Sequence, residues 1–138
     1  MVRQFQLRTT GKGLFEITNS VARIVSEAEI ENGICNVFLQ HTSAGLIIQE
    51  NADPSAKRDL ERWLDRHVIE NDPNFTHTTE GPDDMPSHIR AVLTGVSLSI
   101  PVINGELGLG TWQGIYLCEH RNNGGRRKLI LTLTGTEK

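Results

Sequence analysis

Strand-like runs outnumber helix-like runs in this chain, and this ratio restricts the fold. Alternating or apolar patterns typical of strands cover residues 4–8, 14–17, 34–41, 46–51, 97–103, 111–120 and 128–134. Apolar residues at helical spacing cover only 21–28, 53–68 and 86–93. A doubly wound parallel sheet needs more helices than this. The sequence therefore predicts an α+β fold, a layered mixed or antiparallel sheet with about three helices.

Local signals define several connections. Gly11-Lys12-Gly13 predicts a hairpin between the first two strands, and Asn104-Gly105 predicts another after the strand at 97–103. A turn at 122–125 would join the last two strands into the end of a meander. Asp53 and Pro54 suit the N-cap and first position of the longest helix.

Composition indicates one globular domain over residues 1–138. Apolar residues make up 37% and charged residues 22% of the chain, which argues against disorder. No apolar run could span a bilayer and the N-terminus lacks a signal-peptide pattern, so we expect no membrane partner. A net charge of −3 gives no basic surface for nucleic acid. Cys35 and Cys118 form no CxxC pair, which favours reduced thiols and a cytoplasmic location.

Two of the three stretches that could carry chemistry lie at strand ends. His41 shares a strand face with Val37 and Leu39, so it is either a site residue at the core rim or a core histidine bonded to the backbone. His120 ends the strand at 111–120. Glu119, beside it, falls on a mostly apolar face, where a carboxylate needs a partner, a metal or a proton unless the strand end is exposed.

The third stretch, residues 77–88, holds two histidines and three carboxylates in twelve residues. His88 would lie in the first turn of a helix, where the helix dipole favours the neutral imidazole that a metal requires. The alternatives are helix capping by Asp83 or Asp84, or a solvated loop. Because of its length and composition, the segment 71–83 is expected to fold over the site.

No contiguous zinc, phosphate-loop or nucleophile-elbow motif is present, so any site must be assembled across the fold. Histidines at the ends of three elements predict one metal bound by His41, His88 and His120. Three imidazoles favour zinc, whereas carboxylates alone would favour magnesium. The residues expected to act in catalysis are Glu119, Asp84 and His77, and those expected to bind substrate or phosphate are Ser43, Thr42, Arg121 and Gln113. Strand alternation aims Glu119 away from His120, which conflicts with its expected role as general base.

Four motifs resemble those of the YjbQ-like family. They are His41-Thr42-Ser43-Ala44, Glu50-Asn51-Ala52-Asp53-Pro54, residues 80–86 with His88, and residues 110–117 with Glu119-His120-Arg121. The resemblance covers essentially the whole chain; Gly45 and Gln49 depart from the expected serine and asparagine. It implies an α+β layered domain, a homotrimer, metal binding through histidines and a secondary thiamine-phosphate synthase activity.

That activity joins an aminopyrimidine diphosphate to a thiazole phosphate and expels pyrophosphate, a charge that a divalent metal would stabilise. The sequence leaves three functions open: an enzyme acting on a phosphorylated small molecule, a metal- or phosphate-dependent hydrolase, and a non-enzymatic trimeric metal- or ligand-binding protein. A second argument for a homotrimer comes from the strand at 112–117. It is apolar on both faces, so both faces must be covered, and we expect a neighbouring subunit to cover one of them.

Overall fold

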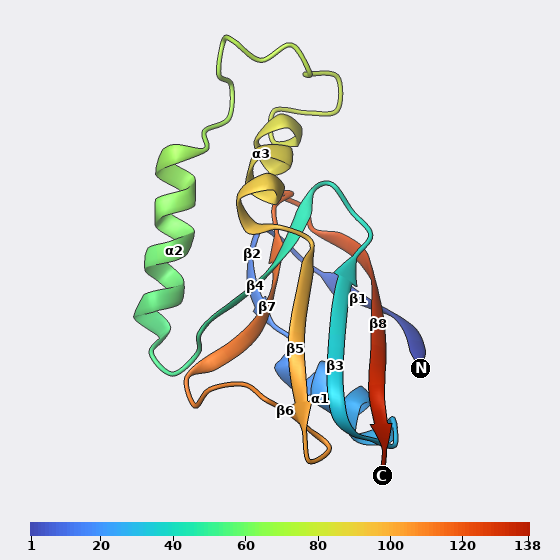
Figure 1. Cartoon of the computed structure of the whole chain (residues 1–138). Coiled ribbons are helices and arrows are strands. Elements are labelled where there is room, and N and C mark those ends of the chain that lie inside the picture. The colour runs from blue at the N-terminus through green and yellow to red at the C-terminus, as the bar shows by residue number, and fades with distance from the viewer.

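The computed structural model describes all residues, 1–138, and contains eight strands and three helices (Figure 1). In chain order these are β1 Val2–Thr9, β2 Gly13–Glu16, α1 Thr18–Glu27, β3 Ile30–Leu39, β4 Ala44–Glu50, α2 Pro54–His67, α3 Asp84–Thr94, β5 Ser97–Ile103, β6 Glu106–Leu107, β7 Gln113–Glu119 and β8 Gly125–Glu137. The α+β class and the three helices are confirmed. No helix is both long enough and apolar enough to cross a membrane.

The strands form two sheets in which every neighbouring pair is antiparallel. One has the order β1-β8-β3-β5-β6 and the other the order β2-β7-β4. The expected hairpin across residues 11–13 is wrong, because β1 pairs with β8 over eight residues and β2, only four residues long, pairs with β7. The expected terminal meander is wrong for a related reason, since β7 and β8 belong to different sheets. The Asn104-Gly105 hairpin is confirmed between β5 and β6.

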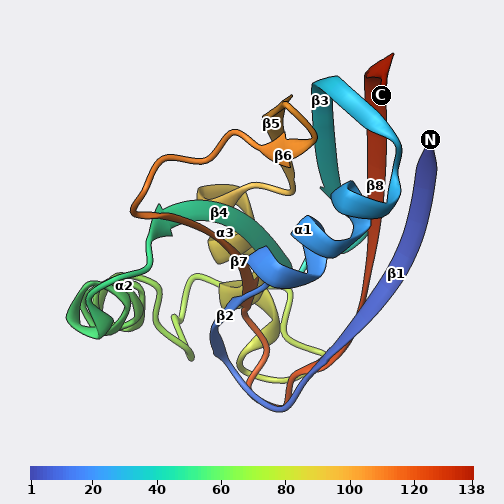
Figure 2. The same ribbon diagram turned by 90° about the horizontal axis from the view of Figure 1, so that it is seen from below.

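The core fills the angle between the two sheets. Seen from below, α1 lies inside that angle (Figure 2). Its Val21 and Val25 are fully buried against strand residues such as Val37, Leu117 and Leu131, in one cluster of 18 buried residues. Alternation in β3 and β8 directs one apolar row of each strand into this cluster.

Strand β7 is covered on both faces by its own chain. Ile115 and Leu117 join the main core, whereas Tyr116 and Cys118 join a smaller cluster with Leu14, against which Leu60 of α2 packs. This strand therefore needs no neighbouring subunit to bury it, so the sequence-based motive for a trimer is wrong.

Helix α2 begins as expected but packs less than expected. The carboxylate of Asp53 accepts a hydrogen bond from the backbone N–H of Ser55 at 2.9 Å, and Pro54 is the first helical residue. No residue of α2 is buried, and Trp63 stays exposed, where its ring stacks on His67 at 4.1 Å. The apolar stripe is only half covered because the short β2 offers it little surface.

The chain crosses between the two sheets six times, and three of these crossings follow β1, β3 and β7. Contacts between distant segments show that these three crossings meet at one end of the molecule. The hydroxyl of Thr9 donates to Glu119, and Arg127 donates to Ser43. The start of α3 lies against the same end, because Arg121 after β7 donates to Asp83 and Asp84.

Candidate metal centre

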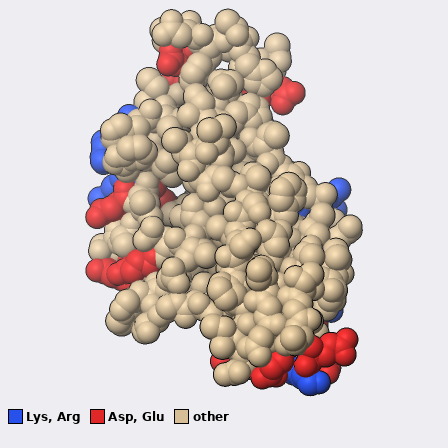
Figure 3. Space-filling view, viewed as in Figure 1, with Lys and Arg blue, Asp and Glu red and all other residues tan.

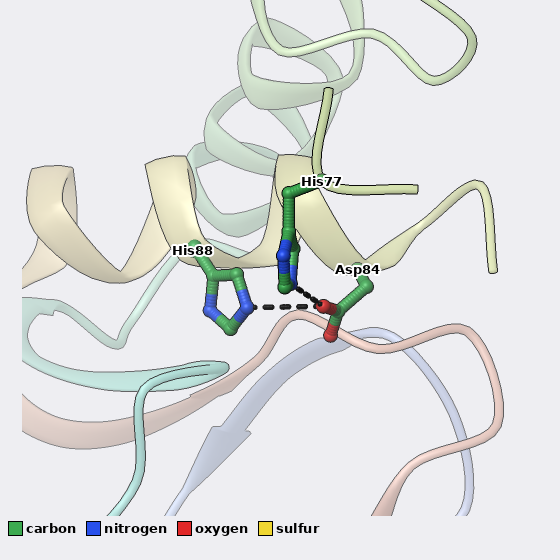
Figure 4. A group of neighbouring side chains, drawn as sticks. All are labelled: His77, Asp84 and His88. Carbon is green, nitrogen blue, oxygen red and sulfur yellow. Dashed lines mark hydrogen bonds and ion pairs between the residues drawn. The ribbon is translucent and has the colours of Figure 1, made fainter. Parts of the chain in front are cut away.

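Two histidines and an aspartate meet at the start of α3. Asp84 and His88 are four residues apart, so the helix places both side chains on one face. His77 reaches them from the segment that precedes the helix. The Asp84 Oδ2 atom lies 2.7 Å from Nε2 of His77 and 3.1 Å from Nε2 of His88 (Figure 4). One donor atom from each of the three residues lies within 4.8 Å of the other two, the spacing that shared coordination of a metal requires.

The hydrogen bonds of His88 fix which ring nitrogen carries its proton. Its Nδ1 lies 2.8 Å from the carbonyl oxygen of Thr42, and a carbonyl can only accept, so Nδ1 carries the hydrogen. In the neutral ring, Nε2 then presents a lone pair to the carboxylate of Asp84. Two acceptors at 3.1 Å require a proton or a cation between them. Metal-binding histidines usually donate their other N–H in this way to a backbone carbonyl or a carboxylate.

Asp84 is a buried carboxylate that stays ionised. Its side chain is 2% exposed, and burial alone would raise its pKa. Hydrogen bonds and charges from His77, His88 and Arg121 outweigh burial and hold the pKa of Asp84 below its usual value. The Nη1 of Arg121 donates to Asp84 at 2.5 Å, and its Nε donates to Asp83 at 3.0 Å. Neither aspartate caps the helix with its side chain, so the capping alternative is wrong.

An open hollow of about 1090 Å³ adjoins this group. Its apolar wall consists of Phe38, Leu39, Met85, Ala91, Val92 and Val96. Its polar lining consists of Gln40, His41, Thr42, Ser43, His77 and His88. No lysine or arginine lines the hollow. A ligand here would therefore meet imidazoles and hydroxyls on the polar side and bury an apolar portion on the other.

The structure does not assemble the expected centre of His41, His88 and His120. His41 lines the hollow, but its Nε2 accepts from the backbone N–H of Lys128 at 2.8 Å. His120 is buried beneath the end of α3, where its Nε2 lies 3.1 Å from the hydroxyl of Thr94. Thr94 is six residues beyond His88, which corresponds to roughly 9 Å along a helix. His88 instead joins His77 and Asp84, both expected from sequence as catalytic residues.

Glu119 is not placed as a general base. It is 1% exposed and accepts from Thr9 Oγ1 at 2.5 Å, from Arg127 Nε at 2.7 Å and from the backbone N–H of Arg121 at 3.0 Å. Burial raises its pKa, but the hydrogen bonds from Arg127 and Thr9 outweigh burial and lower the pKa of Glu119. It lines a second, small cavity of about 70 Å³ together with His120, not the hollow beside the candidate centre.

Only two of the four expected substrate-binding residues lie beside the hollow. Thr42 and Ser43 line the hollow. Arg121 does not, because its guanidinium donates to Asp83, to Asp84 and to the carbonyl of Glu80. Gln113 begins β7 and accepts from Gly110, roughly 20 Å of strand away from Glu119 at the other end.

Arg127 was missed in the sequence, although a signal was present. Alternation along β8 places Arg127 in the same row as Leu129, Leu131 and Leu133, and all four are buried. An arginine in an apolar row must have a carboxylate partner, which here is Glu119.

The fold and the group at α3 define a class: small α+β domains with two curled antiparallel sheets and a candidate metal centre beside an open hollow. More narrowly, residues 3–136 match the family described as UPF0047 protein YjbQ-like, and the chain belongs to that family. The resemblance seen in the sequence is confirmed at this level.

The sequences of several relatives align with nearly the whole length of this chain. UPF0047 protein sll1880 of Synechocystis is 46% identical over 94% of this chain and 88% of its own length. UPF0047 protein YjbQ of Escherichia coli O157:H7 is 43% identical over 94% of both chains. The crystal structure of a YjbQ/UPF0047 family protein from Clostridium acetobutylicum superimposes with a TM-score of 0.88, at 37% identity, over 96% of this chain and 99% of that one.

Proposed function

We propose that this protein is a metal-dependent enzyme acting on a phosphorylated small molecule, with the metal bound by His77, Asp84 and His88. The observation that carries the proposal is the Nδ1–H of His88 donating to Thr42, because in the neutral ring this leaves the Nε2 lone pair facing the Asp84 carboxylate, where a cation can bind both. Two nitrogens and one oxygen are a donor set typical of zinc, whereas magnesium prefers oxygen alone. Three protein ligands would leave a coordination position for water or substrate.

The residues around the group have separate roles in this proposal. A bound metal would supply a Lewis acid that stabilises the charge of a leaving phosphate or pyrophosphate. Thr42 and Ser43 provide polar contacts to the substrate, and the apolar wall of the hollow excludes water from its remaining surface.

His41 would add a hydrogen-bond donor beside the metal ligands. Burial, with the nearby charge of Arg127, lowers the pKa of His41, which favours a neutral ring. Because its Nε2 accepts from Lys128, the neutral ring carries its hydrogen on Nδ1, and this N–H can donate to a substrate oxygen.

The reaction to be tested first is the coupling of the aminopyrimidine diphosphate to the thiazole phosphate, the secondary thiamine-phosphate synthase activity that the resemblance of the sequence motifs implies. Elemental analysis of the purified protein and turnover of the two precursors should both be measured, before and after treatment with chelator. We expect about one zinc per chain and a coupling activity that chelation abolishes and added zinc restores.

Other outcomes separate the remaining functions. Metal-dependent release of phosphate from a simple phosphate ester, without coupling, would identify a hydrolase. Saturable ligand binding without turnover would identify a binding protein. Protein that neither contains metal nor binds added zinc or magnesium would overturn the proposal.

We also propose that the protein is a cytoplasmic homotrimer. Both cysteines are free, which supports a reducing compartment. Support for self-association comes from the outer face of the five-stranded sheet. Between the charged ends of this face, the residues that share it are uncharged: Val2, Gln4, Ile34, Asn36, Phe38, Ser97, Ser99, Pro101, Ile103, Ile130, Thr132 and Thr134. Arg8, Arg126 and Lys128 lie on the same face at one end, and Glu106 pairs with Ile103 at the other. Figure 3 shows charged residues mainly at the margins of the molecule in this view.

The exposed face includes Ile34, Phe38 and Ile103, which a further copy of the chain would cover. Light scattering at micromolar concentration should give about three times the 15.4 kDa mass of one chain. A mass near 15.4 kDa would exclude the trimer.

A further inference from the structure

Glu119 contacts two chain segments that lead to the candidate metal ligands. Its carboxylate is fully enclosed, and both oxygens accept hydrogen bonds. One bond comes from the side chain of Arg127 on β8 and another from the backbone N–H of Arg121 after β7. None of its contacts involves the hollow, so Glu119 can influence the ligands only through these neighbours.

The first connection runs through Arg127 to His88. While Arg127 binds Glu119 through Nε and Nη2, its Nη1 donates to Ser43 Oγ at 2.9 Å and its Nη2 donates to the Ser43 carbonyl at 3.1 Å. These bonds hold the crossing between β3 and β4. The neighbouring carbonyl of Thr42 accepts the Nδ1–H of His88, so the position of this crossing determines where that acceptor lies.

The second connection runs through Arg121 to Asp84. Glu119 Oε2 accepts from the Arg121 backbone at 3.0 Å, which fixes the start of the segment after β7. The side chain of the same residue then donates to Asp84 at 2.5 Å. Glu119 therefore contacts both Arg127, which holds the segment that binds His88, and Arg121, which binds Asp84.

A buried ion pair is an inefficient way to gain stability, because the cost of desolvating two charges offsets their attraction. An arginine fork nevertheless fixes direction, since its planar donors bind a carboxylate in two parallel bonds. We propose that Glu119 and Arg127 are positioning residues, which hold Thr42 and Ser43 so that His88 keeps its hydrogen on Nδ1 and its Nε2 toward the metal. This inference rests on the proposed metal centre.

Arg127→Lys tests the proposal while keeping a positive charge beside Glu119. Lysine carries three donors on one atom and has no fork, so it cannot replace the four hydrogen bonds that Arg127 makes to Glu119 and Ser43. We expect zinc affinity, measured by competition with a chelating dye, to fall roughly 10–100-fold, as changes around metal ligands usually do. The matched control is Arg126→Lys, the same change at the adjacent, exposed position of β8, which should leave affinity unchanged.

A second measurement needs no metal. Imidazole ¹⁵N spectra of chelated protein at pH 8.5 should show His88 of the native chain in the Nδ1–H form, and a mixture of the two neutral forms in Arg127→Lys. A folded Arg127→Lys protein with the native His88 form and native zinc affinity would overturn the proposal. If the native chain binds no metal, the proposed function fails, but the ring spectra still decide whether this pair positions His88.

Ser43→Ala provides a test that leaves the ion pair intact, in case Arg127→Lys does not fold. It removes only the Oγ acceptor of Arg127. A smaller loss of zinc affinity and a partial shift of the His88 proton are expected. Native values for both in Ser43→Ala would overturn the proposal if Arg127→Lys does not fold.

Discussion

Arg90 of α3 donates to Asp65 of α2 at 3.1 Å and, with the same Nη2 atom, to the carbonyl of Val68 at 3.1 Å. The arginine is almost completely buried, whereas the aspartate is half exposed. Since no residue of α2 is buried, this arginine is a principal link between α2 and the rest of the domain. Lys12 adds a second bond to Asp65 at 2.9 Å.

Arg90→Leu should therefore loosen α2 more than it loosens the sheets. Loss of the bond leaves the Val68 carbonyl without this donor, a change that costs about 1–3 kcal/mol. Hydrogen exchange should show faster exchange in residues 54–68 with little change in β3 and β8. Arg62→Leu, on the exposed face of α2, is the control, and equal protection of α2 in both variants would show that Arg90 does not tether the helix.

Stability should fall as the pH drops from about 6.5 to about 4 because of His120. Burial, with the nearby charge of Arg90, lowers the pKa of His120 to about 4. In the unfolded chain the pKa is about 6.5, so below that pH the unfolded state binds the extra proton and is favoured. The contribution is fully lost near pH 4 and amounts to about 3 kcal/mol at about 1.4 kcal/mol per pKa unit.

Urea unfolding of the native chain and of His120→Gln across this range checks the effect. The variant lacks the imidazole but keeps every carboxylate, so the difference between the two slopes reports His120 and its coupling to Glu119. Parallel curves between pH 4.5 and 6.5 would contradict the lowered pKa.

Zinc titrations distinguish the centre that the structure gathers from the one expected from sequence. His77→Gln should weaken zinc binding by more than the roughly 10–100-fold typical of changes outside the ligand shell. His120→Gln should leave it nearly unchanged, because His120 lies at the other end of α3. His67→Gln, at the exposed end of α2, controls for nonspecific zinc binding. The reverse order of effects would restore the three-histidine centre.

Gly45→Ala should destabilise the contact between β4 and α3. A Cβ atom at position 45 would lie 1.9 Å from Oγ1 of Thr94 and 2.9 Å from the carbonyl oxygen of Gly95. Overpacking of this kind costs about 1–3 kcal/mol. As Thr94 is placed here, there is no room for the side chain of the serine expected at position 45.

Thermal or urea unfolding measures that cost. Gly110→Ala, where the nearest atom is the flexible side chain of Gln113 at 3.3 Å, should cost much less. Combining Gly45→Ala with Thr94→Ala should cost less than the sum of the two single changes. Strict additivity would show that Thr94 is not the source of the strain.

Local patterns predicted the elements of this fold well but not their partners. Asp53 and Pro54 mark the start of α2, and the strand at residues 97–103 matches β5. The prediction of a hairpin across residues 11–13 was wrong. The glycines indicate that the chain can turn there, but they do not indicate which strands will pair. Pairing depends on the 13-residue β8, which is distant in sequence and offers β1 a longer partner.

The candidate centre was recognised only in part. The twelve residues that contain His77, Asp84 and His88 were identified from composition and helical position, since those are local properties. The structure does not bring His41 and His120 to His88. Strand alternation predicts which face of its strand His120 occupies, but not how far that residue lies from the start of α3. The role of Arg127 needs the register of β8 against its neighbours, which no local pattern supplies.

The strand order has a consequence for the chain as it leaves the ribosome. Because β8 lies between β1 and β3, the larger sheet is divided until the last strand has been made. Until then β1 and β3 both present open edges, which can pair with other chains. Thr9 must likewise wait for Glu119, and Ser43 for Arg127. A nascent chain without β8 would thus contain all the other strands and helices, but β1 would not be joined to β3. Ser43 would also lack its bond from Arg127.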